Sequence, residues 1–327
     1  MAILRGLRAR HEFATVSMDT WVNVQVISDQ PRAVIEPTVQ RALAWFETVE
    51  RICTRFDANS EVMRLLTNVG SPVRVSTLLF EVAAFAMDLA EQTGGAFDPT
   101  VGARLEQLGF NVNYRTGETV RSDVAVDPSY ADVRLDRRAR TILLRRQVVL
   151  DLNAVAKGLA IDLAVQELRD YAHLCVEAGG DLYVRGRNAA GELWHVGVQH
   201  PRAEGLLART LRVTDVAVCT SGDYERRAPG PSAAPHLLDA RTQQPVTELA
   251  SVTVVAPTAM AADGLSTAAM VLGRERGLRL LEDQGVGGLL MSPDGTFVTT
   301  RGDVDALSAC TSENHMRSDA RVSGEDA

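Results

Sequence analysis

The sequence lacks the features that would mark a membrane, secreted or nucleic-acid-binding protein. No uninterrupted apolar stretch approaches the length of a membrane span. The N-terminal segment carries Arg5, Arg8 and Arg10, but no apolar run follows them as a secretory signal requires. Acidic residues outnumber basic ones and give a net charge of −8, which argues against a polyanion-binding surface. We therefore expect a cytoplasmic protein with no membrane span and no nucleic-acid partner.

Paired cysteines and a dinucleotide-binding motif are also absent. The four cysteines are widely scattered, and none forms a CxxC pair: Cys53, Cys175, Cys219 and Cys310. A structural zinc site is therefore not expected, and a reducing compartment fits best. No GxGxxG sequence follows an expected strand, so a Rossmann fold has no support.

What the chain does have is enough apolar sequence for a substantial core. Its 327 residues are 46% hydrophobic and 23% charged, as is typical of a globular protein. Strand-like and helix-like stretches alternate irregularly, which favours an α+β fold with mixed sheets and packed helices. We expect a single domain over residues 1–307, followed by a polar, disordered tail over residues 308–327.

Several elements can be placed from periodicity and from helix-capping residues. Ser76 caps an expected helix over 77–92, which Gly94 and Gly95 end, and Thr258 caps another that runs to Gly273. A strand is expected over 15–27, a helix over 38–55, and a strand over 148–153 that leads into a helix over 155–169. Residues 174–186 are expected to form two strands separated by a bulge at Gly179 and Gly180.

Asp263 and Thr267 lie four residues apart in the helix that follows Thr258. This spacing places a carboxylate and a hydroxyl on one helix face. Hard oxygen ligands so arranged suit Mg²⁺, which takes one or two protein carboxylates together with phosphate and water. An aspartate that is partly buried and hydrogen-bonded to a neighbouring hydroxyl would give the same pattern, so this fragment alone leaves both interpretations open.

Other short stretches also have two interpretations. Gly94 and Gly95 permit a ligand to approach the backbone before the segment Ala96-Phe97-Asp98, although a plain turn would use the same residues. Lys157 opens a helix near Asp151, where the macrodipole disfavours a cation, so it indicates a bound anion or an exposed lysine. Ser221 belongs to a hydroxyl-rich strand end that could contact phosphate.

The order of these stretches resembles that of the ApbE family of FAD:protein FMN transferases. The resemblance extends from about residue 15 to residue 300. Its matching segments are Ser17-Met18-Asp19-Thr20-Trp21, Arg55-Phe56-Asp57-Ala58-Asn59-Ser60-Glu61, Gly94-Gly95-Ala96-Phe97-Asp98-Pro99-Thr100, Asp151-Leu152-Asn153-Ala154-Val155-Ala156-Lys157-Gly158, Thr220-Ser221-Gly222-Asp223-Tyr224-Glu225, His236-Leu237-Leu238-Asp239-Ala240-Arg241-Thr242 and Ala262-Asp263 through Thr267.

The resemblance implies an ApbE-like fold, an activity and a set of site residues. The expected reaction moves FMN from FAD to a Ser or Thr hydroxyl of an acceptor flavoprotein and releases AMP. Asp263, Thr267 and the backbone carbonyl of Ala154 match the family's Mg²⁺ ligands. His236 and Asp239 are the candidates for the catalytic base. The residues expected to contact FAD are Met18, Phe56, Ala96, Phe97, Asp98, Asp151, Lys157, Ser221 and His236.

Two departures from the family pattern concern turns. Asp19 stands where the family has glycine in Met-Gly-Thr, and the family's Asp-Pro-Arg-Thr-Gly is here Asp239-Ala240-Arg241-Thr242-Gln243. We expect the second turn, with the loop over 228–235, to form the rim through which the acceptor enters. Two alternative functions are Mg²⁺-dependent hydrolysis of FAD to FMN and AMP, and flavin binding without catalysis.

Overall fold

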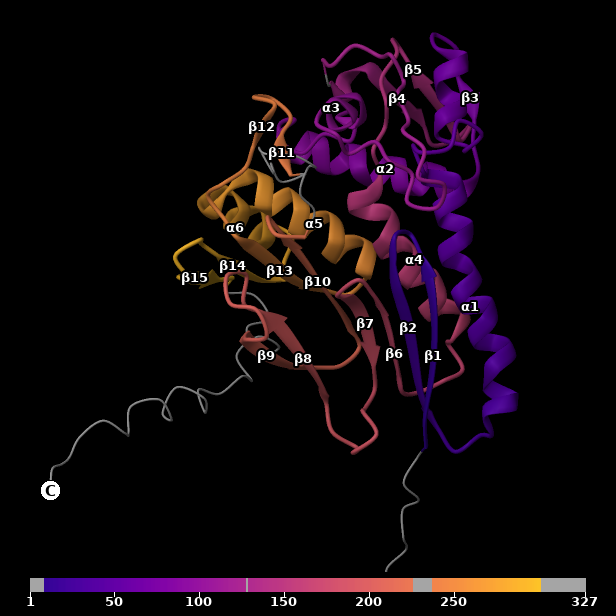
Figure 1. Cartoon of the computed structure of the whole chain (residues 1–327), viewed down its shortest axis with the longest axis vertical. Coiled ribbons are helices and arrows are strands. Elements are labelled where there is room, and N and C mark those ends of the chain that lie inside the picture. The colour runs from indigo at the N-terminus through magenta and orange to yellow at the C-terminus, as the bar shows by residue number, and fades with distance from the viewer. Residues whose placement is uncertain (1–8, 128, 226–236, 301–327) are drawn as a thin grey trace, which may run out of the picture.

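An eight-stranded antiparallel sheet forms the centre of the computed structural model, which describes residues 9–127, 129–225 and 237–300 (Figure 1). Its strand order is β1-β2-β6-β7-β10-β13-β14-β15. The strands are β1 (Ala9–Ser17), β2 (Thr20–Ser28), β6 (Leu174–Ala178), β7 (Asp181–Arg185), β10 (Val216–Gly222), β13 (Ser251–Ala256), β14 (Gly287–Met291) and β15 (Phe297–Thr299).

Three smaller sheets accompany the large one. A three-stranded sheet has the order β3-β5-β4, and two-stranded sheets join β8 to β9 and β11 to β12. Their strands are β3 (Val73–Arg74), β4 (Val133–Asp136), β5 (Thr141–Leu144), β8 (Trp194–Gln199), β9 (Leu207–Val213), β11 (Leu238–Asp239) and β12 (Gln244–Pro245).

The helices fall into two groups by size. The short ones are α3 (Gly102–Gln107) and the 3₁₀ helices η1 (Met63–Asn68) and η2 (Tyr130–Asp132). The longer ones are α1 (Arg32–Cys53), α2 (Thr77–Gln92), α4 (Asn153–Glu167), α5 (Ala259–Leu272) and α6 (Arg274–Asp283). None of the helices in the described part of the chain is both long and apolar enough to cross a lipid bilayer.

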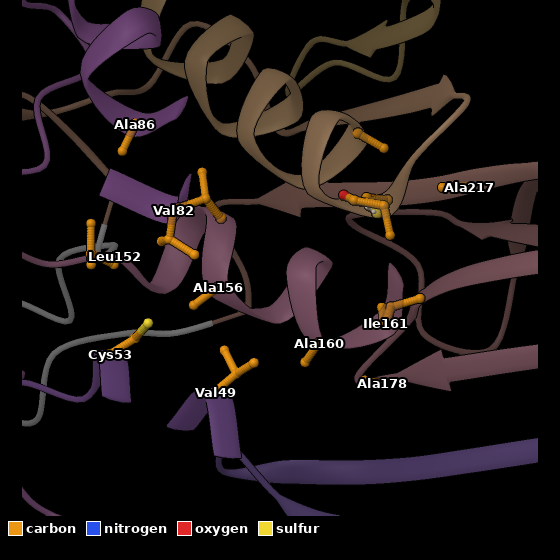
Figure 2. Close-up of a cluster of buried hydrophobic side chains, with 14 of the residues drawn as sticks. Val49, Cys53, Val82, Ala86, Leu152, Ala156, Ala160, Ile161, Ala178 and Ala217 are labelled. Atoms are coloured by element: carbon orange, nitrogen blue, oxygen red, sulfur yellow. Dashed lines mark hydrogen bonds between the residues drawn. The ribbon is translucent and has the colours of Figure 1, made fainter. Parts of the chain in front are cut away.

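The strands in the middle of the large sheet, such as β10, β13 and β14, are buried on both faces. Alternate strand residues such as Ala217 and Cys219 belong to the main core with the helices, whereas Val218 between them packs with Trp194 and Leu211 of β8 and β9. Helices therefore cover one face and the β8–β9 ribbon covers the other. Figure 2 shows side chains of the helical core, contributed by α1, α2 and α4 and by the sheet: Val49, Cys53, Val82, Ala86, Leu152, Ala156, Ala160, Ile161, Ala178 and Ala217.

Close packing against α4 fixes the start of α5. A Cβ atom at Gly158 would lie 2.4 Å from the carbonyl oxygen of Ala259, so only glycine permits this approach. Asp162 of α4 accepts hydrogen bonds from the N–H groups of Ala259 (2.7 Å) and Met260 (2.9 Å), which satisfies donors that a helix start leaves unpaired. The start of α5 is thereby held against the middle of α4.

The α+β class is confirmed, and so are several predicted elements. Helix α2 has the predicted bounds, with the Ser76 hydroxyl accepting from the N–H of Leu79 at 3.2 Å. Helix α5 follows its predicted cap at Thr258 and ends at Gly273. Where mixed sheets were expected, all pairings between the described strands are antiparallel, and a parallel bridge joins only Val101 to Val149.

Other local predictions were wrong. The segment 148–153 is not a strand, because beyond the Val149 bridge its backbone pairs with a loop, as when Asp151 N–H donates to the Pro99 carbonyl at 2.7 Å. The stretch 15–27 is not one strand, because it turns back at Met18 and Asp19. Gly179 and Gly180 are not a bulge but the turn between β6 and β7, with φ values of 60° and 91°. The expected tail over 308–327 lies outside the described residues.

Candidate active site

A cavity of about 760 Å³ lies where the β1–β2 turn meets the start of α4 and one side of α5, next to the loops after α1 and α2. This volume is in the range of cofactor-binding clefts. The cavity brings together ten of the residues that the sequence singled out: Met18, Phe56, Phe97, Asp98, Asp151, Ala154, Lys157, Ser221, Asp263 and Thr267. Segments that are far apart in the sequence therefore share one concave surface.

A buried ion pair occupies the part of the cavity next to α4. Lys157 Nζ lies 2.6 Å from Asp181 Oδ2, while Asp181 Oδ1 accepts from the N–H of Thr220 at 2.9 Å. Burial alone would lower the pKa of Lys157, but the carboxylates of Asp181, Asp263 and Glu225 outweigh it and raise that pKa. The lysine is therefore a fixed positive charge.

Asp263 lies beside this pair, where burial and a second carboxylate disfavour its charged form. Its Oδ2 accepts from the N–H of Gly158 at 3.1 Å. Burial, reinforced by the carboxylate of Asp181, raises the pKa of Asp263 well above its usual value, although Lys157 and the Gly158 N–H oppose this. A cation next to Asp263 would reverse that shift.

Hydroxyl groups line the cavity beside Asp263. Ser221 Oγ lies 2.8 Å from Ser266 Oγ and 2.9 Å from Thr267 Oγ1. The Thr267 hydroxyl thus contacts Ser221, and the hydroxyl of Ser266 donates to the Asp263 carbonyl at 2.8 Å. The helical spacing allowed a hydrogen bond between the Asp263 carboxylate and the Thr267 hydroxyl. In the structure the Thr267 hydroxyl instead contacts Ser221, and the Asp263 carboxylate accepts from the N–H of Gly158.

The residues present fit a hard divalent cation. Asp263, Thr267 and Ala154 all line the cavity and offer carboxylate, hydroxyl and carbonyl oxygens. Three carboxylates that act on one lysine also leave negative charge for a cation to offset. Within the described ranges, no group of three or more His, Cys, Asp or Glu side chains is arranged to hold a metal. The donor set therefore matches Mg²⁺ better than zinc.

A second ion pair holds the loop after α1. Arg55 Nε donates to Asp151 Oδ2 at 2.7 Å, with the two side chains only 3% and 9% exposed. Arg55 also donates to the Phe110 carbonyl at 2.6 Å, and its guanidinium lies 4.2 Å from the centroid of the Phe56 ring. Phe56 is half-buried, with this arginine packed on its ring. Asp151 was expected near Lys157, but the structure pairs it with Arg55.

The turn after α2 is held by its own aspartate. Asp98 Oδ1 accepts from the N–H and hydroxyl of Thr100 at 2.8 and 2.7 Å, and Oδ2 accepts from the Tyr130 N–H at 2.7 Å. Burial raises the pKa of Asp98, while these hydrogen bonds oppose the rise. Phe97 and Asp98 line the cavity, whereas Ala96 is buried and its carbonyl accepts from Ala240 N–H at 3.0 Å.

Of the two candidates for the catalytic base, the structure describes Asp239 but not His236. His236 lies outside the described residues, as does the loop over 228–235. Asp239 is not among the cavity-lining residues, and its carboxylate pairs with Arg241 at 2.5 Å. Partial burial would raise the pKa of Asp239, but the Arg241 side chain and backbone N–H lower it. A lowered pKa weakens a carboxylate as a proton acceptor.

The β1–β2 turn contributes Met18 and Asp19 to the cavity. Both residues have positive φ values, 55° and 61°. Glu50 of α1 fixes the turn, since its Oε2 accepts from the Ser17 hydroxyl and the Met18 N–H, each at 3.0 Å. Arg115 donates to the same oxygen at 2.6 Å.

Sequence reasoning did not single out Asp181, Glu225, Arg55 or Glu50. Arg55 and Glu225 lay inside matched segments and could have been found there, as charged residues beside predicted ligand contacts. Asp181 could have been found because it directly follows Gly179 and Gly180 between two strands. No local signal points to Glu50, because α1 contains other glutamates and nothing in the helical pattern marks this one as only 14% exposed.

Comparisons with known proteins agree over most of the chain. The sequence model of the ApbE family matches residues 18–290. The FAD:protein FMN transferase of Haemophilus influenzae is 30% identical over 302 residues, which cover 86% of this chain and 87% of that protein. The FAD:protein FMN transferase of Treponema pallidum is 31% identical over 328 residues, covering 92% and 91%. The crystal structure of an ApbE protein from Thermotoga maritima gives a TM-score of 0.79 at 28% identity, covering 90% of this chain and 97% of that one.

Proposed function

The chain belongs to the ApbE family, and on this basis we propose that it transfers FMN from FAD to a Ser or Thr hydroxyl of an acceptor protein, with Mg²⁺ bound and AMP released. Relatives at 30% and 31% identity carry the name FAD:protein FMN transferase. The observation that supports the proposal most is the cavity, which gathers Lys157, Asp263 and Thr267 beside Phe56 and Phe97. A flavin dinucleotide needs such a combination of charged and aromatic contacts.

The proposed chemistry is attack by a hydroxyl on a pyrophosphate phosphorus. The acceptor oxygen forms a bond to the phosphorus of the FMN half of FAD. The bond from that phosphorus to the bridging oxygen of the pyrophosphate breaks. The bridging oxygen leaves with AMP, and the hydroxyl proton passes to a base. Such a step depends chiefly on positioning and on offsetting the phosphate charge.

The residues predicted from the sequence have proposed parts in this step. Lys157 offsets phosphate charge, and Asp181 holds its ammonium group in place at 2.6 Å. Asp263, Thr267 and the Ala154 carbonyl would hold Mg²⁺, which supplies charge neutralisation at the pyrophosphate. Phe56 would stack on a ring of FAD. Met18, Ala96, Phe97, Asp98, Asp151 and Ser221 complete the proposed FAD contacts. We assign the base to His236, because Asp239 is committed to Arg241.

The compartment is part of the same proposal. Cys53, Cys175 and Cys219 are free thiols, each buried in the core. Free thiols are usual where the surroundings are reducing. We therefore propose that the acceptor is modified in the cytoplasm.

The test follows AMP release and the mass of an added FMN group. The protein is incubated with FAD and Mg²⁺, with and without candidate acceptors. A transferase releases AMP in step with modification of the acceptor, a pyrophosphatase releases AMP without one, and a flavin-binding protein releases none. Only the first result agrees with the proposal.

A pair of variants tests the metal assignment. Asp263→Asn keeps the shape of the side chain but removes the charge, and we expect turnover to fall at least about a hundredfold. The control is Asp283→Asn, the same change at an exposed aspartate at the end of α6 that is not among the cavity-lining residues, and it should change turnover by no more than about threefold. Equal activity of Asp263→Asn and the wild-type protein at limiting Mg²⁺ would refute the metal assignment.

A further inference from the structure

An aromatic side chain in the cavity wall has no part in the function proposed above. Tyr114 lines the cavity and is 39% exposed. It belongs to residues 111–120, which lie between two of the segments that match the family pattern and inside neither of them. We call this stretch the 111–120 loop. Because cofactor clefts are lined largely by aromatic and apolar side chains, a tyrosine ring left open to the cavity is suited to contact a ligand.

Hydrogen bonds within the 111–120 loop define the shape of its tip. The N–H of Asn113 donates to the Glu118 carbonyl at 2.9 Å, and the N–H of Gly117 donates to the Asn113 carbonyl at 2.8 Å. The Asn113 side chain accepts from the N–H of Arg115 at 2.9 Å and so closes the turn that carries Tyr114. The ring of Tyr114 is therefore presented from a hydrogen-bonded turn.

Other hydrogen bonds tie the loop to two elements that carry predicted FAD contacts. Asn113 Nδ2 donates to the Phe56 carbonyl at 3.2 Å. At the tip, Tyr114 OH accepts from Arg115 Nε at 2.9 Å and is hydrogen-bonded to the backbone of Asp19 in the β1–β2 turn. The loop therefore spans the cavity wall between Phe56 and that turn.

Glu50 of α1 holds the tip of the loop and the β1–β2 turn together. Its Oε2 accepts from Arg115 at 2.6 Å and also from the Met18 N–H and the Ser17 hydroxyl, each at 3.0 Å. An unpaired arginine would favour a phosphate group here. Because Glu50 offsets the charge of Arg115, the tip of the loop is better suited to a neutral ring.

We propose that Tyr114 is a further FAD-binding residue, whose ring stacks on one of the two planar ring systems of FAD. This inference rests on the proposed function, since it requires the pyrophosphate to lie at Lys157 and Asp263. A pyrophosphate in that position leaves the isoalloxazine and the adenine to be covered by other parts of the cavity. Both are flat aromatic rings, so a tyrosine stacks on either by the same offset geometry.

The test measures how much FAD affinity the ring of Tyr114 contributes. Isothermal titration calorimetry gives the Kd of the full-length protein for FAD, without acceptor or Mg²⁺ so that no turnover occurs. Tyr114→Ala should raise this Kd about tenfold, the effect expected when a stacking aromatic side chain is removed. Tyr114→Phe keeps the ring and loses only the hydroxyl, so its Kd should stay within about threefold of the wild-type value.

Phe297→Ala is the matched control. Phe297 is 43% exposed and has the guanidinium of Arg209 4.7 Å from its ring centroid, much as Tyr114 has that of Arg115 at 5.6 Å. It lies on β15, at the opposite edge of the large sheet from the β1–β2 turn, and is not among the cavity-lining residues (Figure 1). Its Kd for FAD should equal that of the wild-type protein.

Titrations with FMN and with AMP identify the ring that Tyr114 contacts. Tyr114→Ala should raise the Kd for one of them about tenfold and change the Kd for the other by less than about twofold. Equal weakening of both would mean that the variant disturbs the cavity as a whole, and it would refute the stacking contact. So would a Tyr114→Phe protein that loses as much affinity as Tyr114→Ala, because the effect would then belong to the hydroxyl.

Failure of the proposed function gives a different result from failure of this inference. Wild-type protein that binds no FAD refutes both. Protein that binds FAD with the same Kd after Tyr114→Ala refutes the contact alone. Protein that loses affinity as expected in Tyr114→Ala, but neither releases AMP nor modifies an acceptor, refutes the proposed transfer and leaves the contact established.

Discussion

Individual residues in the cavity owe their positions to partners that are remote in the sequence. Lys157 is held by Asp181 of β7, and Arg55 is held by Asp151, the residue that precedes α4. Both pairs place a carboxylate with little or no exposure against a cation. Removing one member of such a pair leaves the other charge buried without compensation, which is costly.

The Lys157–Asp181 pair gives a prediction about stability. Lys157→Ala leaves Asp181, which is 2% exposed, without its cation, and we expect the free energy of unfolding to fall by about 3 kcal/mol. The control is Arg41→Ala, which breaks an exposed pair with Glu167 of similar length, 2.7 Å, and should cost less than about 1 kcal/mol. Urea denaturation measures both, and equal losses would contradict the prediction.

The raised pKa of Lys157 also predicts how the stability difference between Lys157→Ala and the wild-type protein depends on pH. Because the pKa of Lys157 is raised on folding, its contribution is complete below the unfolded-state pKa and is lost only as the pH rises through the folded value. The unfolded-state pKa of lysine is about 10.4. The stability difference between Lys157→Ala and the wild-type protein should therefore stay constant from about pH 6 to pH 9.

For single residues, the sequence predicts which side chains lie on the same face of one helix. It does not predict which side chains of two different elements form an ion pair. The helical period places Asp263 and Thr267 on one face of α5, and both line the cavity. The partner of Lys157 could not be predicted, because it depends on how the β6–β7 hairpin packs against α4. Asp151 is closer to Lys157 in the sequence than Asp181 is, but it forms its ion pair with Arg55.

Among the elements, the turns differ most from the family pattern. Asp19 and Gln243 stand where the family has glycine, and both adopt positive φ values, 61° and 56°. Gln243 ends the turn between β11 and β12, and its N–H donates to the Asp239 carbonyl at 2.7 Å. The chain has therefore kept the left-handed backbone at both positions without the residue that adopts it most easily.

These two turns give a prediction about glycine substitution. Gln243→Gly should raise the free energy of unfolding by about 1 kcal/mol, because it relieves a left-handed glutamine. Asp19→Gly should raise the free energy of unfolding by less, since aspartate tolerates the left-handed conformation better than glutamine does. Gln243→Ala is the control: it removes the hydrogen bond to the Val126 carbonyl but keeps the Cβ atom. A Gln243→Gly protein no more stable than Gln243→Ala would show that the turn stores no strain.

Elements with their own local signals were the ones that the sequence predicted. Helix α2 has a serine cap and a terminal glycine pair, and its bounds were correct. The apolar run Val148–Leu150 carries no such signal, and it is buried by packing around an isolated bridge and not by a strand ladder. The β1–β2 turn was missed because Met-Asp is not a typical sequence for a hairpin turn.

On the scale of the whole molecule, the cavity depends on the complete fold. Its walls come from the hairpin at one edge of the sheet, from loops after α1 and α2, and from α4 and α5 (Figure 1). No periodicity in the sequence brings these segments together. The resemblance brought them together through the order of the matched segments, from about residue 15 to residue 300, and the family model matches residues 18–290. A ligand that fills the cavity should consequently stabilise the fold as a unit.

This gives a last prediction, on the ligand itself. FAD at about 100 times its Kd should stabilise the protein by about 2.7 kcal/mol and raise the Tm by about 4 °C. Riboflavin at the same concentration should raise it by less than half as much, because it lacks the pyrophosphate and adenylate groups that we propose Lys157, Asp263 and Thr267 contact from the cavity wall. The measurement is thermal unfolding with FAD, riboflavin or AMP, each with and without Mg²⁺, with mass spectrometry to verify that FAD remains intact. Mg²⁺ should enlarge the shift for FAD and leave that for riboflavin unchanged, since only FAD carries a pyrophosphate for the cation to bind. Equal shifts for riboflavin and FAD would mean that the charged half of the cavity is not a pyrophosphate site.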